Sequence, residues 1–297
     1  MSQAVQPLKP TDPVSFYAEL TCRNFHFVSS DLQKKLSQVR VLIAGCGSTG
    51  GACIEALARA GVQHFALADN GSYELNNLNR QHARLENLGE NKAAFHAKEI
   101  KSINPYTEVG VSEDGINAQN VDRLVEWADF IFDAVDVTTP SGIKAKVLLH
   151  QKCHKFKKPV LSGLDLGYLQ WGCSYDYRRG EIAPLKGKAD AALTAKHPIA
   201  ALCAIYPLHI IPNDCVSLLV DLFEQKIDFA PQMGCTSDAL SAIIVPALMK
   251  LVGTGELISG WHLDLAPYRY TRKERFSNWL RSFALRRKMR SHLRRLR

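Results

Sequence analysis

Residues 39–50 read Val-Arg-Val-Leu-Ile-Ala-Gly-Cys-Gly-Ser-Thr-Gly, an apolar run that leads directly into glycines. The run predicts a short buried strand, and the alanine-rich stretch 49–61, closed by a glycine, predicts a helix. A Gly-x-Gly-x-x-Gly motif between a strand and a helix suits the binding of phosphate groups, because glycines allow close approach and the first helical amides are free donors. The motif therefore favours a nucleotide site over an ordinary tight turn.

Strand-like and helix-like segments alternate along the following hundred residues. The strands are expected at 64–68, 108–111, 130–135 and 159–162, and the helices at 92–103, 120–127 and 141–156. Such alternation predicts a parallel sheet with helices on both faces. The expected fold class is α/β, a Rossmann-like, doubly wound and mostly parallel sheet.

The pattern changes after residue 163. Residues 167–177 alternate large apolar and polar side chains, which predicts an antiparallel C-terminal extension of the sheet. The stretch 178–213 lacks a clear period and is interpreted as a long crossing loop. Further elements are expected as helices at 214–226 and 237–252, the second kinked or broken at Pro246, and a strand at 261–265.

Charge divides the chain into a body and a basic tail. Residues 269–297 hold twelve Lys or Arg and one acid, so this stretch carries a net charge of +11 and residues 1–268 carry −3. We expect a polar, proline-containing flexible arm at 1–14, one domain at 15–268 and the tail at 269–297.

The tail is expected to form a basic amphipathic helix. One apolar stripe contains Phe276, Trp279, Leu280 and Phe283, and a second, offset stripe contains Leu285, Met289, Leu293 and Leu296. Such a helix suits an acidic peptide, RNA phosphates such as those of tRNA, or an anionic membrane surface, and it could also dock against a dimer partner. The sequence leaves these alternatives open.

Composition excludes several classes of protein. With 46% hydrophobic and 22% charged residues, the chain is typical of a globular protein and not of a disordered chain, a collagen or a coiled coil. It has no secretory signal and no uninterrupted apolar run long enough for a transmembrane segment, so we expect a cytoplasmic protein. Its eight cysteines include no Cys-x-x-Cys pair, which predicts reduced thiols and no zinc site.

Polar residues follow the glycine turn in a characteristic order. Asp69 ends the second expected strand, where an acid can bind ribose hydroxyls, and is followed by Asn77-Leu78-Asn79-Arg80-Gln81, Lys92 and Asp136. In this order and spacing the sequence resembles the ThiF/MoeB/HesA family, the bacterial relatives of ubiquitin-activating enzymes. The resemblance covers residues 20–165 well and extends more loosely to 237–252 and the strand near 263.

The resemblance implies a site that joins a substrate carboxylate to AMP with release of pyrophosphate, with ATP and Mg²⁺ as cofactors. The implied roles are phosphate contact at Gly45, Gly47 and Gly50, ribose binding by Asp69, ordering of the phosphate loop by Asn77 and Gln81, phosphate binding by Arg80 and Lys92, Mg²⁺ binding by Asp136, and reach into the partner's site of a homodimer by Arg23. Charge supports the role of Arg80 and Lys92 independently, because a transition state at the α-phosphorus needs cations close by. The structural alternatives are solvated surface charges for these two cations and a helix N-cap for Asp136.

The sequence departs from the family in two places, and its cysteine chemistry is open. Gly71 stands where many members have a second acid, and Val137-Thr138-Thr139-Pro140 stands where many have an asparagine after the later aspartate. Both departures bear on how ribose and metal are held. A nucleophilic cysteine would need exposure and a lowered pKa; Cys235, just before an expected helix, is the candidate, with Cys173, Cys203 and Cys215 as rivals.

The leading hypothesis is an adenylyltransferase that acts on a carboxylate of a small carrier protein or a ribosomally made peptide. Modification of a carboxylate-bearing tRNA nucleoside is an alternative within the same family. Two other classes stay open, an NAD-dependent oxidoreductase on the same sheet and a non-catalytic scaffold that binds ATP without turnover.

Overall fold

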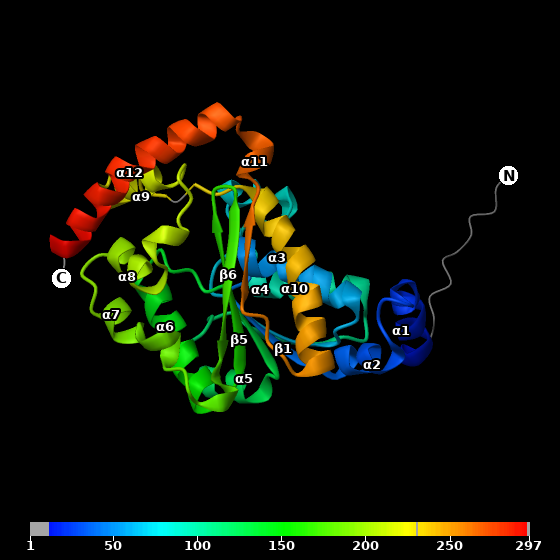
Figure 1. Ribbon diagram of the computed structural model, residues 1–297. Helices are drawn as coiled ribbons and strands as arrows, with labels where there is room; N and C mark the ends of the chain where they lie inside the picture. The colour runs from blue at the N-terminus through cyan, green and yellow to red at the C-terminus, as the bar shows by residue number, and fades with distance from the viewer. Residues whose placement is uncertain (1–11, 230, 296–297) are drawn as a thin grey trace.

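A seven-stranded sheet organises the chain in the computed structural model, which describes residues 12–229 and 231–295 (Figure 1). The strand order is β3-β2-β1-β4-β5-β6-β7; neighbours are parallel from β3 to β5, and β6 and β7 are antiparallel to the strand before them. The strands are β1 (Arg40–Ala44), β2 (His64–Ala68), β3 (Glu108–Ser112), β4 (Phe130–Asp133), β5 (Pro159–Leu166), β6 (Leu169–Asp176) and β7 (Gly260–Asp264). The α/β fold class with an antiparallel extension is confirmed.

Helices cover both faces of this sheet (Figure 1). They are α1 (Pro13–Thr21), α2 (Ser30–Gln38), α3 (Ser48–Ala60), α4 (Lys92–Ile103), α5 (Val121–Trp127), α6 (Pro140–Lys155), α7 (Ala189–Leu193), α8 (Pro198–Ile205), α9 (Val216–Phe223), α10 (Gly234–Thr254), α11 (Ala266–Arg269) and α12 (Arg272–Arg295). The strand order changes direction between β1 and β4, and in open α/β sheets ligands bind at the carboxyl ends of the strands beside such a point.

Alternating side chains of β1 divide the core between the two faces. Val41 and Ile43 pack with α3 and α10, whereas Leu42 and Ala44 pack with α5 and α6. All four side chains are fully buried. This two-sided burial explains why the strand reads as a continuous apolar run, and it fixes the glycine turn at the end of β1 in the middle of the sheet.

Helix α10 is the most apolar long helix that the structure describes. Within residues 12–229 and 231–295 it alone has the length and composition of a membrane span. This is weak evidence for a membrane-spanning segment, because buried core helices pass the same test. Here Leu240, Ile244 and Leu248 are fully buried in the cluster that also contains α3. The helix continues through Pro246 as one element, so of the two predicted alternatives, a kink or a break, the break is wrong.

Two stretches differ from the sequence-based expectation. The predicted loop 178–213 contains α7 and α8 together with short 3₁₀ turns, and their apolar side chains join the core. The boundary of the predicted arm at residue 14 falls within α1, which Asp12 caps by accepting a hydrogen bond from the Ser15 amide at 2.9 Å. Residues 1–11 of that arm lie outside the described residues.

The basic tail begins at the last residue of α11 and forms the long helix α12, which lies across the end of the sheet and along α9 (Figure 1). Of the two predicted stripes, the second makes the contact: Met289 is fully buried, and Leu285 and Leu293 pack beside it. Leu296, the last member of that stripe, lies outside the described residues. The first stripe is exposed.

Candidate active site

The glycine turn between β1 and α3 is as tight as the motif predicts. Gly45 has a φ of 90°, and a Cβ there would lie 2.3 Å from the Ala134 carbonyl oxygen. A Cβ on Gly50 would lie 1.8 Å from the carbonyl oxygen of Gly45. Gly47 is the N-cap of α3 and makes no side-chain cap, so the first amides of the helix are presented to a ligand.

Asp69 braces this turn from the end of β2. One carboxylate oxygen accepts a hydrogen bond from the Cys46 amide at 2.6 Å, and the other accepts one from the Gly71 amide at 2.7 Å. Asn91, the N-cap of α4, donates to the Asp69 carbonyl oxygen at 2.9 Å. Each carboxylate oxygen keeps acceptor capacity for a hydroxyl group. Asp69 thus has a structural role that the sequence did not reveal, and it keeps acceptor capacity at the end of β2.

Gly71 brings Lys92 close to Asp69. A Cβ on Gly71 would lie 3.1 Å from Asp69 Oδ1 and 3.5 Å from Lys92 Nζ, so a larger residue would crowd both groups. The Lys92 amide donates to the Gly71 carbonyl oxygen at 2.9 Å, and its ammonium group lies 5.8 Å from the centre of the Tyr73 ring. Within the described part of the chain, no carboxylate forms an ion pair with Lys92. Its positive charge is therefore available to a phosphate.

The segment Asn77–Gln81 folds against the glycine turn. Asn77 Oδ1 accepts from the Glu74 amide at 3.2 Å, and the Gln81 amide donates to the Asn77 carbonyl oxygen at 2.9 Å. The Gln81 side chain is buried, and its amide nitrogen lies 3.8 Å from where a Cβ on Gly47 would stand. Gln81 Oε1 has no hydrogen-bond partner among the described residues. Asn77 therefore shapes the segment Asn77–Gln81, and the Gln81 side chain faces the glycine turn.

Arg80 joins this loop to the distant segment before α10. Its Nε donates to Gln232 Oε1 at 2.5 Å, and Nη1 donates to the Asn76 carbonyl oxygen at 2.8 Å. Gln232 in turn forms a β-bridge with Gly167 in the β5–β6 turn. Burial lowers the pKa of Arg80, and the negative charges of Asp165 and Asp136 oppose this effect. The guanidinium group is thus held in a fixed position at the carboxyl edge of the sheet.

Asp136 lies on the exposed loop after β4. Its two oxygens accept hydrogen bonds from Thr138, at 2.9 Å from the amide and 2.8 Å from the hydroxyl. Thr139 caps α6 by accepting from the Gly142 amide at 3.1 Å, so the alternative that Asp136 is the N-cap is wrong. Among residues 12–229 and 231–295, no group of three or more His, Cys, Asp or Glu side chains is arranged to hold a metal.

Arg23 and Cys235 differ in their distance from the glycine turn and the Arg80 segment. Arg23 is exposed, and its neighbour Asn24 donates to the Ala60 carbonyl oxygen at 3.5 Å, at the far end of α3 from the glycine turn. Thirteen helical residues separate the two ends of α3 by about 20 Å. Cys235 is exposed in the first turn of α10, directly after Gly234, where a Cβ would lie 3.2 Å from the Arg80 Cα. The structure therefore gathers Cys235 with the site residues and leaves Arg23 apart.

The rival cysteines are less accessible. Cys173 and Cys215 are buried and Cys203 is half-buried. Burial raises the pKa of Cys203 to about 12, and burial with the nearby Asp214 charge raises that of Cys215 to about 12. A thiol with such a pKa is protonated at neutral pH and is a poor nucleophile.

Two buried carboxylates next to the site were not identified from the sequence. Asp165, at the end of β5, accepts from the hydroxyls of Thr49 at 3.0 Å and Ser237 at 3.0 Å, and from the amide of Gln170. Burial raises its pKa despite these hydrogen bonds. The carboxylate connects the first turn of α3 to the first turn of α10. An acid inside an apolar strand, Leu-Ser-Gly-Leu-Asp-Leu, was the available signal.

Asp133 is the second such carboxylate, at the end of β4. It pairs with the buried Lys146 and accepts from His150 Nε2 at 2.9 Å, both from α6, and its other oxygen accepts from the Val135 amide at 3.2 Å. Burial alone would raise the pKa of Asp133, but the charge of Lys146 and the hydrogen bond with His150 hold it below the usual value. This network fixes the turn that leads to Asp136.

Comparison with known proteins identifies the family to which this arrangement belongs. The ThiF family model matches residues 21–171, about half of the chain. The chain belongs to the ThiF family. The resemblance inferred from the glycine turn, Asp69, the Arg80 segment and Lys92 is thereby confirmed.

Several curated ThiF-family relatives are about 30% identical to the chain. The adenylyltransferase and sulfurtransferase MOCS3 of Culex quinquefasciatus is 31% identical over 258 residues, which is 78% of this chain and 58% of that protein. The heterocyst protein HesA of Trichormus variabilis is 30% identical over 52% of this chain and 55% of that protein. The tRNA threonylcarbamoyladenosine dehydratase of Escherichia coli K12 is 30% identical over 56% of each. The chain thus spans about half the length of the curated relatives it matches.

Solved structures share the fold over a larger part of the chain. A crystal structure of PaaA aligns with 90% of this chain and 83% of its own, with a TM-score of 0.62 and 17% identity. The structure of E. coli MccB with ATP aligns with 79% of this chain and 66% of its own, with a TM-score of 0.54 and 17% identity. At this identity the likeness supports the fold, including the antiparallel extension.

Proposed function

We propose that this chain uses ATP to adenylate a carboxylate and releases pyrophosphate. The observation that carries the proposal is the convergence of the glycine turn, Asp69, Arg80 and Lys92 at the carboxyl edge of the sheet, beside the point where the strand order changes direction. Membership of the ThiF family, with an adenylyltransferase and a structure with bound ATP among the similar proteins, supports it further.

In the proposed mechanism the phosphates rest on the glycine turn and the ribose on Asp69. A carboxylate oxygen of the acceptor attacks the α-phosphorus, the bond between this phosphorus and the bridging oxygen breaks, and pyrophosphate leaves with the electron pair. Lys92 and Arg80 stabilise the charge that develops on the phosphate oxygens. A carboxylate is already ionised at neutral pH, so the step needs no side-chain base.

Asp136 would hold the Mg²⁺ that accompanies ATP. Its carboxylate is exposed, and its only hydrogen bonds among the described residues come from Thr138. A hard cation of this kind uses few protein carboxylates and completes its shell with phosphate oxygens and water. When bound, the ion neutralises charge on the triphosphate.

The active form in this proposal is a cytoplasmic homodimer. Arg23 is exposed and lies at the far end of α3 from its own glycine turn, which supports the proposal that it reaches into the site of a second copy. Cys235 would act after adenylation in those reactions that pass the acyl group to a thiol, because it lies beside the Arg80 segment.

The acceptor in the leading form of the proposal is a small carrier protein or a ribosomally made peptide. The E. coli relative named as a tRNA threonylcarbamoyladenosine dehydratase favours a carboxylate-bearing tRNA nucleoside as the second candidate. ATP–pyrophosphate exchange with each class of acceptor distinguishes the two. A protein that binds Mg-ATP but yields no AMP with either class would be a non-catalytic scaffold.

Calorimetric titration with Mg-ATP and, separately, with NAD tests the proposal first. Selective ATP binding is expected, and Lys92→Ala should weaken it by about 1.5–3 kcal/mol, or about 10- to 150-fold, because a hydrogen bond to a charged group is lost. Lys98→Ala is the matched control, since Lys98 is on the same helix but is exposed and pairs with Glu90. NAD binding without ATP binding would replace adenylation with an oxidoreductase function.

A further inference from the structure

A cavity of about 510 Å³ lies beneath the N-terminal half of α12. Its floor is formed by the ends of β6 and β7 and by residues 209–214, and its roof by α11 and α12. The wall side chains that matter for recognition are Asp214, Asp264, Arg272, Arg275, Phe276 and Trp279. None of these residues belongs to the candidate nucleotide site described above.

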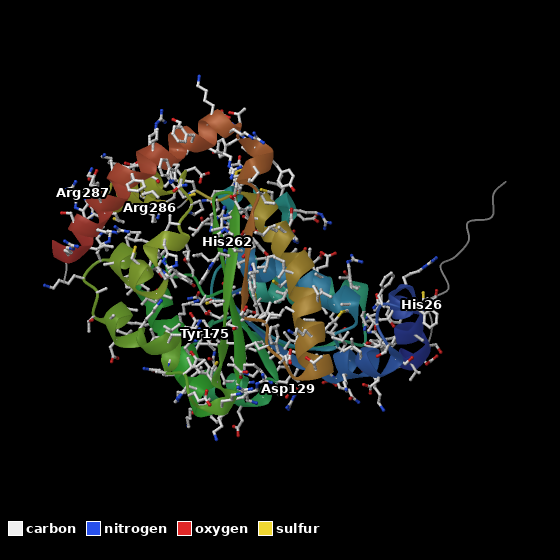
Figure 2. The ribbon with its side chains drawn as sticks, in the orientation of Figure 1. His26, Asp129, Tyr175, His262, Arg286 and Arg287 are labelled. Carbon is white, nitrogen blue, oxygen red and sulfur yellow. The ribbon has the colours of Figure 1, made fainter. Side chains whose placement is uncertain are left out.

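Contacts from Ser282 onward along α12 anchor this roof to the domain. Arg286, which Figure 2 labels with its neighbour Arg287, donates from Nη2 to the Ile211 carbonyl oxygen at 2.5 Å and also contacts the Leu208 carbonyl oxygen. Ser282 donates to Asn213 Oδ1 at 2.9 Å. With Met289 fully buried one turn further on, the helix cannot rotate about its axis without breaking these contacts. The roof therefore has a fixed orientation.

The N-terminal half of the same helix has an apolar stripe with no partner among the described residues. Phe276, Trp279, Leu280 and Phe283 are each exposed by 45% or more, and their spacing puts them on one side of the helix. The three aromatic rings contact one another, with centroids 5.7 Å apart for Phe276 and Trp279 and 5.4 Å for Trp279 and Phe283. Phe276 and Trp279 also line the cavity, so the stripe continues into a concave surface.

The charges around the cavity select for a polypeptide. Arg272 and Arg275 form no ion pair within the described residues, so the rim offers two free guanidinium groups to carboxylates. The floor contains two carboxylates, and burial together with the charge of Asp264 raises the pKa of Asp214. Floor carboxylates repel any anion, so the acidic groups of a ligand must lie at the guanidinium rim. The backbone N–H groups of a peptide can satisfy the floor carboxylates, which a nucleic-acid backbone or a lipid phosphate cannot do.

The cavity adjoins the nucleotide site. Leu169, in its wall, lies two residues after Gly167, which forms the bridge with Gln232, the partner of Arg80. On its other side, Gly167 is so close to Cys215 that a Cβ would lie 2.5 Å from the Cys215 Sγ. The β5–β6 turn is thus the boundary between the two sites, and a chain bound in the cavity reaches the carboxyl edge of the sheet.

We propose that this cavity and the exposed stripe of α12 bind an acidic, aromatic-containing segment of the acceptor polypeptide. In this arrangement acidic side chains pair with Arg272 and Arg275, and apolar side chains pack on Phe276, Trp279 and Phe283. The inference rests on the proposed function for the identity of the bound chain as an acceptor. It names the class of acceptor as a peptide or protein with an acidic recognition segment away from the reacting carboxylate.

Fluorescence anisotropy with the full chain tests this inference. The probe is a fluorescein-labelled random copolymer of glutamate and tyrosine, compared with polyglutamate, bulk tRNA and phosphatidylglycerol vesicles. The copolymer should bind, polyglutamate should bind at least fivefold more weakly, and Trp279→Ala should reduce this difference. The double variant Arg272→Glu with Arg275→Glu should raise the Kd of the copolymer at least tenfold.

The matched control is Arg287→Glu with Arg290→Glu, which makes the same charge change at exposed positions of α12 outside the cavity wall. This pair should change the Kd at most threefold. An equal loss in both pairs, or tighter binding of tRNA or vesicles than of the copolymer, would overturn the proposal. Mg-ATP affinity is measured in parallel. If the Arg272 and Arg275 variant loses copolymer binding but keeps its ATP affinity, the loss arises at the cavity. If the wild-type chain binds no ATP, the proposed function is wrong.

Discussion

His96 provides a quantitative test of how the helix that begins with Lys92 is held in place. This histidine is 3% exposed on α4, its Nε2 lies 3.1 Å from the Tyr73 hydroxyl, and it packs against Gly51 of α3. Burial, with a smaller contribution from the nearby His82, lowers its pKa from 6.5 to about 3. The imidazole is therefore neutral in the folded protein over most of the acid range.

The effect on stability follows from the difference between the folded and unfolded pKa values. Between pH 6.5 and pH 3 the unfolded chain carries a proton on His96 and the folded chain does not, so stability falls as the pH decreases through this window. Through this one group, the free energy of unfolding is about 2 kcal/mol lower at pH 5 than at pH 8. The decrease is about 1.4 kcal/mol for each pH unit below 6.5.

Urea unfolding of wild type and His96→Gln between pH 8 and pH 5 measures this contribution. The variant lacks the titrating group, so its free energy of unfolding should fall by about 2 kcal/mol less than that of wild type over this range. His262→Gln is the control, because it makes the same change at an exposed imidazole instead of a buried one. Parallel pH profiles for wild type and His96→Gln would refute the assignment of a buried neutral histidine.

Two further substitutions test the parts of the fold that shape the site. Lys146→Met leaves the Asp133 carboxylate buried without its cation and should lower the free energy of unfolding, measured by chemical denaturation, by about 3–5 kcal/mol. Adding Asp133→Leu should recover most of this loss. A Lys146→Met variant as stable as wild type would contradict the buried pair. Gly50→Ala should weaken Mg-ATP binding more than tenfold in calorimetry, because its Cβ would lie 1.8 Å from the Gly45 carbonyl oxygen, whereas Gly110→Ala, whose Cβ has nothing closer than 3.9 Å, should bind ATP as wild type does. Equal affinity in the two alanine variants would argue against the tight turn.

Local sequence patterns predicted the central sheet because each pattern has a local physical cause. The apolar run before Gly45 is buried on both faces, and the glycine after α3 takes the left-handed conformation that ends a helix. The pattern failed between residues 178 and 213 because α8 is apolar on nearly all sides and α7 has only five residues, so neither has an amphipathic period. Short buried helices of this kind are determined by tertiary packing.

The sequence showed the family motif where its residues are close together in the chain, and it did not show their distant partners. The order of Asp69, the Arg80 segment and Lys92 could be read directly, since these residues follow their strands within the family pattern. Nothing local indicated that Arg80 would bond to Gln232, 152 positions later, or that Asp165 would accept from Ser48 and Ser237. The two stripes of α12 were likewise visible in the sequence, but only packing decides which of them docks.

The hydrogen bonds of Asp165, which join α3 to α10, also determine when the candidate site can form during synthesis of the chain. The glycine turn and its Thr49 hydroxyl emerge from the ribosome well before Gln232 and Ser237, which lie much later in the sequence. The nascent sheet can assemble through β5 before the residues that fix Arg80 and join α3 to α10 exist. The candidate nucleotide site is therefore completed only after these later residues have been synthesised, and ATP bound there would stabilise the finished domain more than its early folding intermediates.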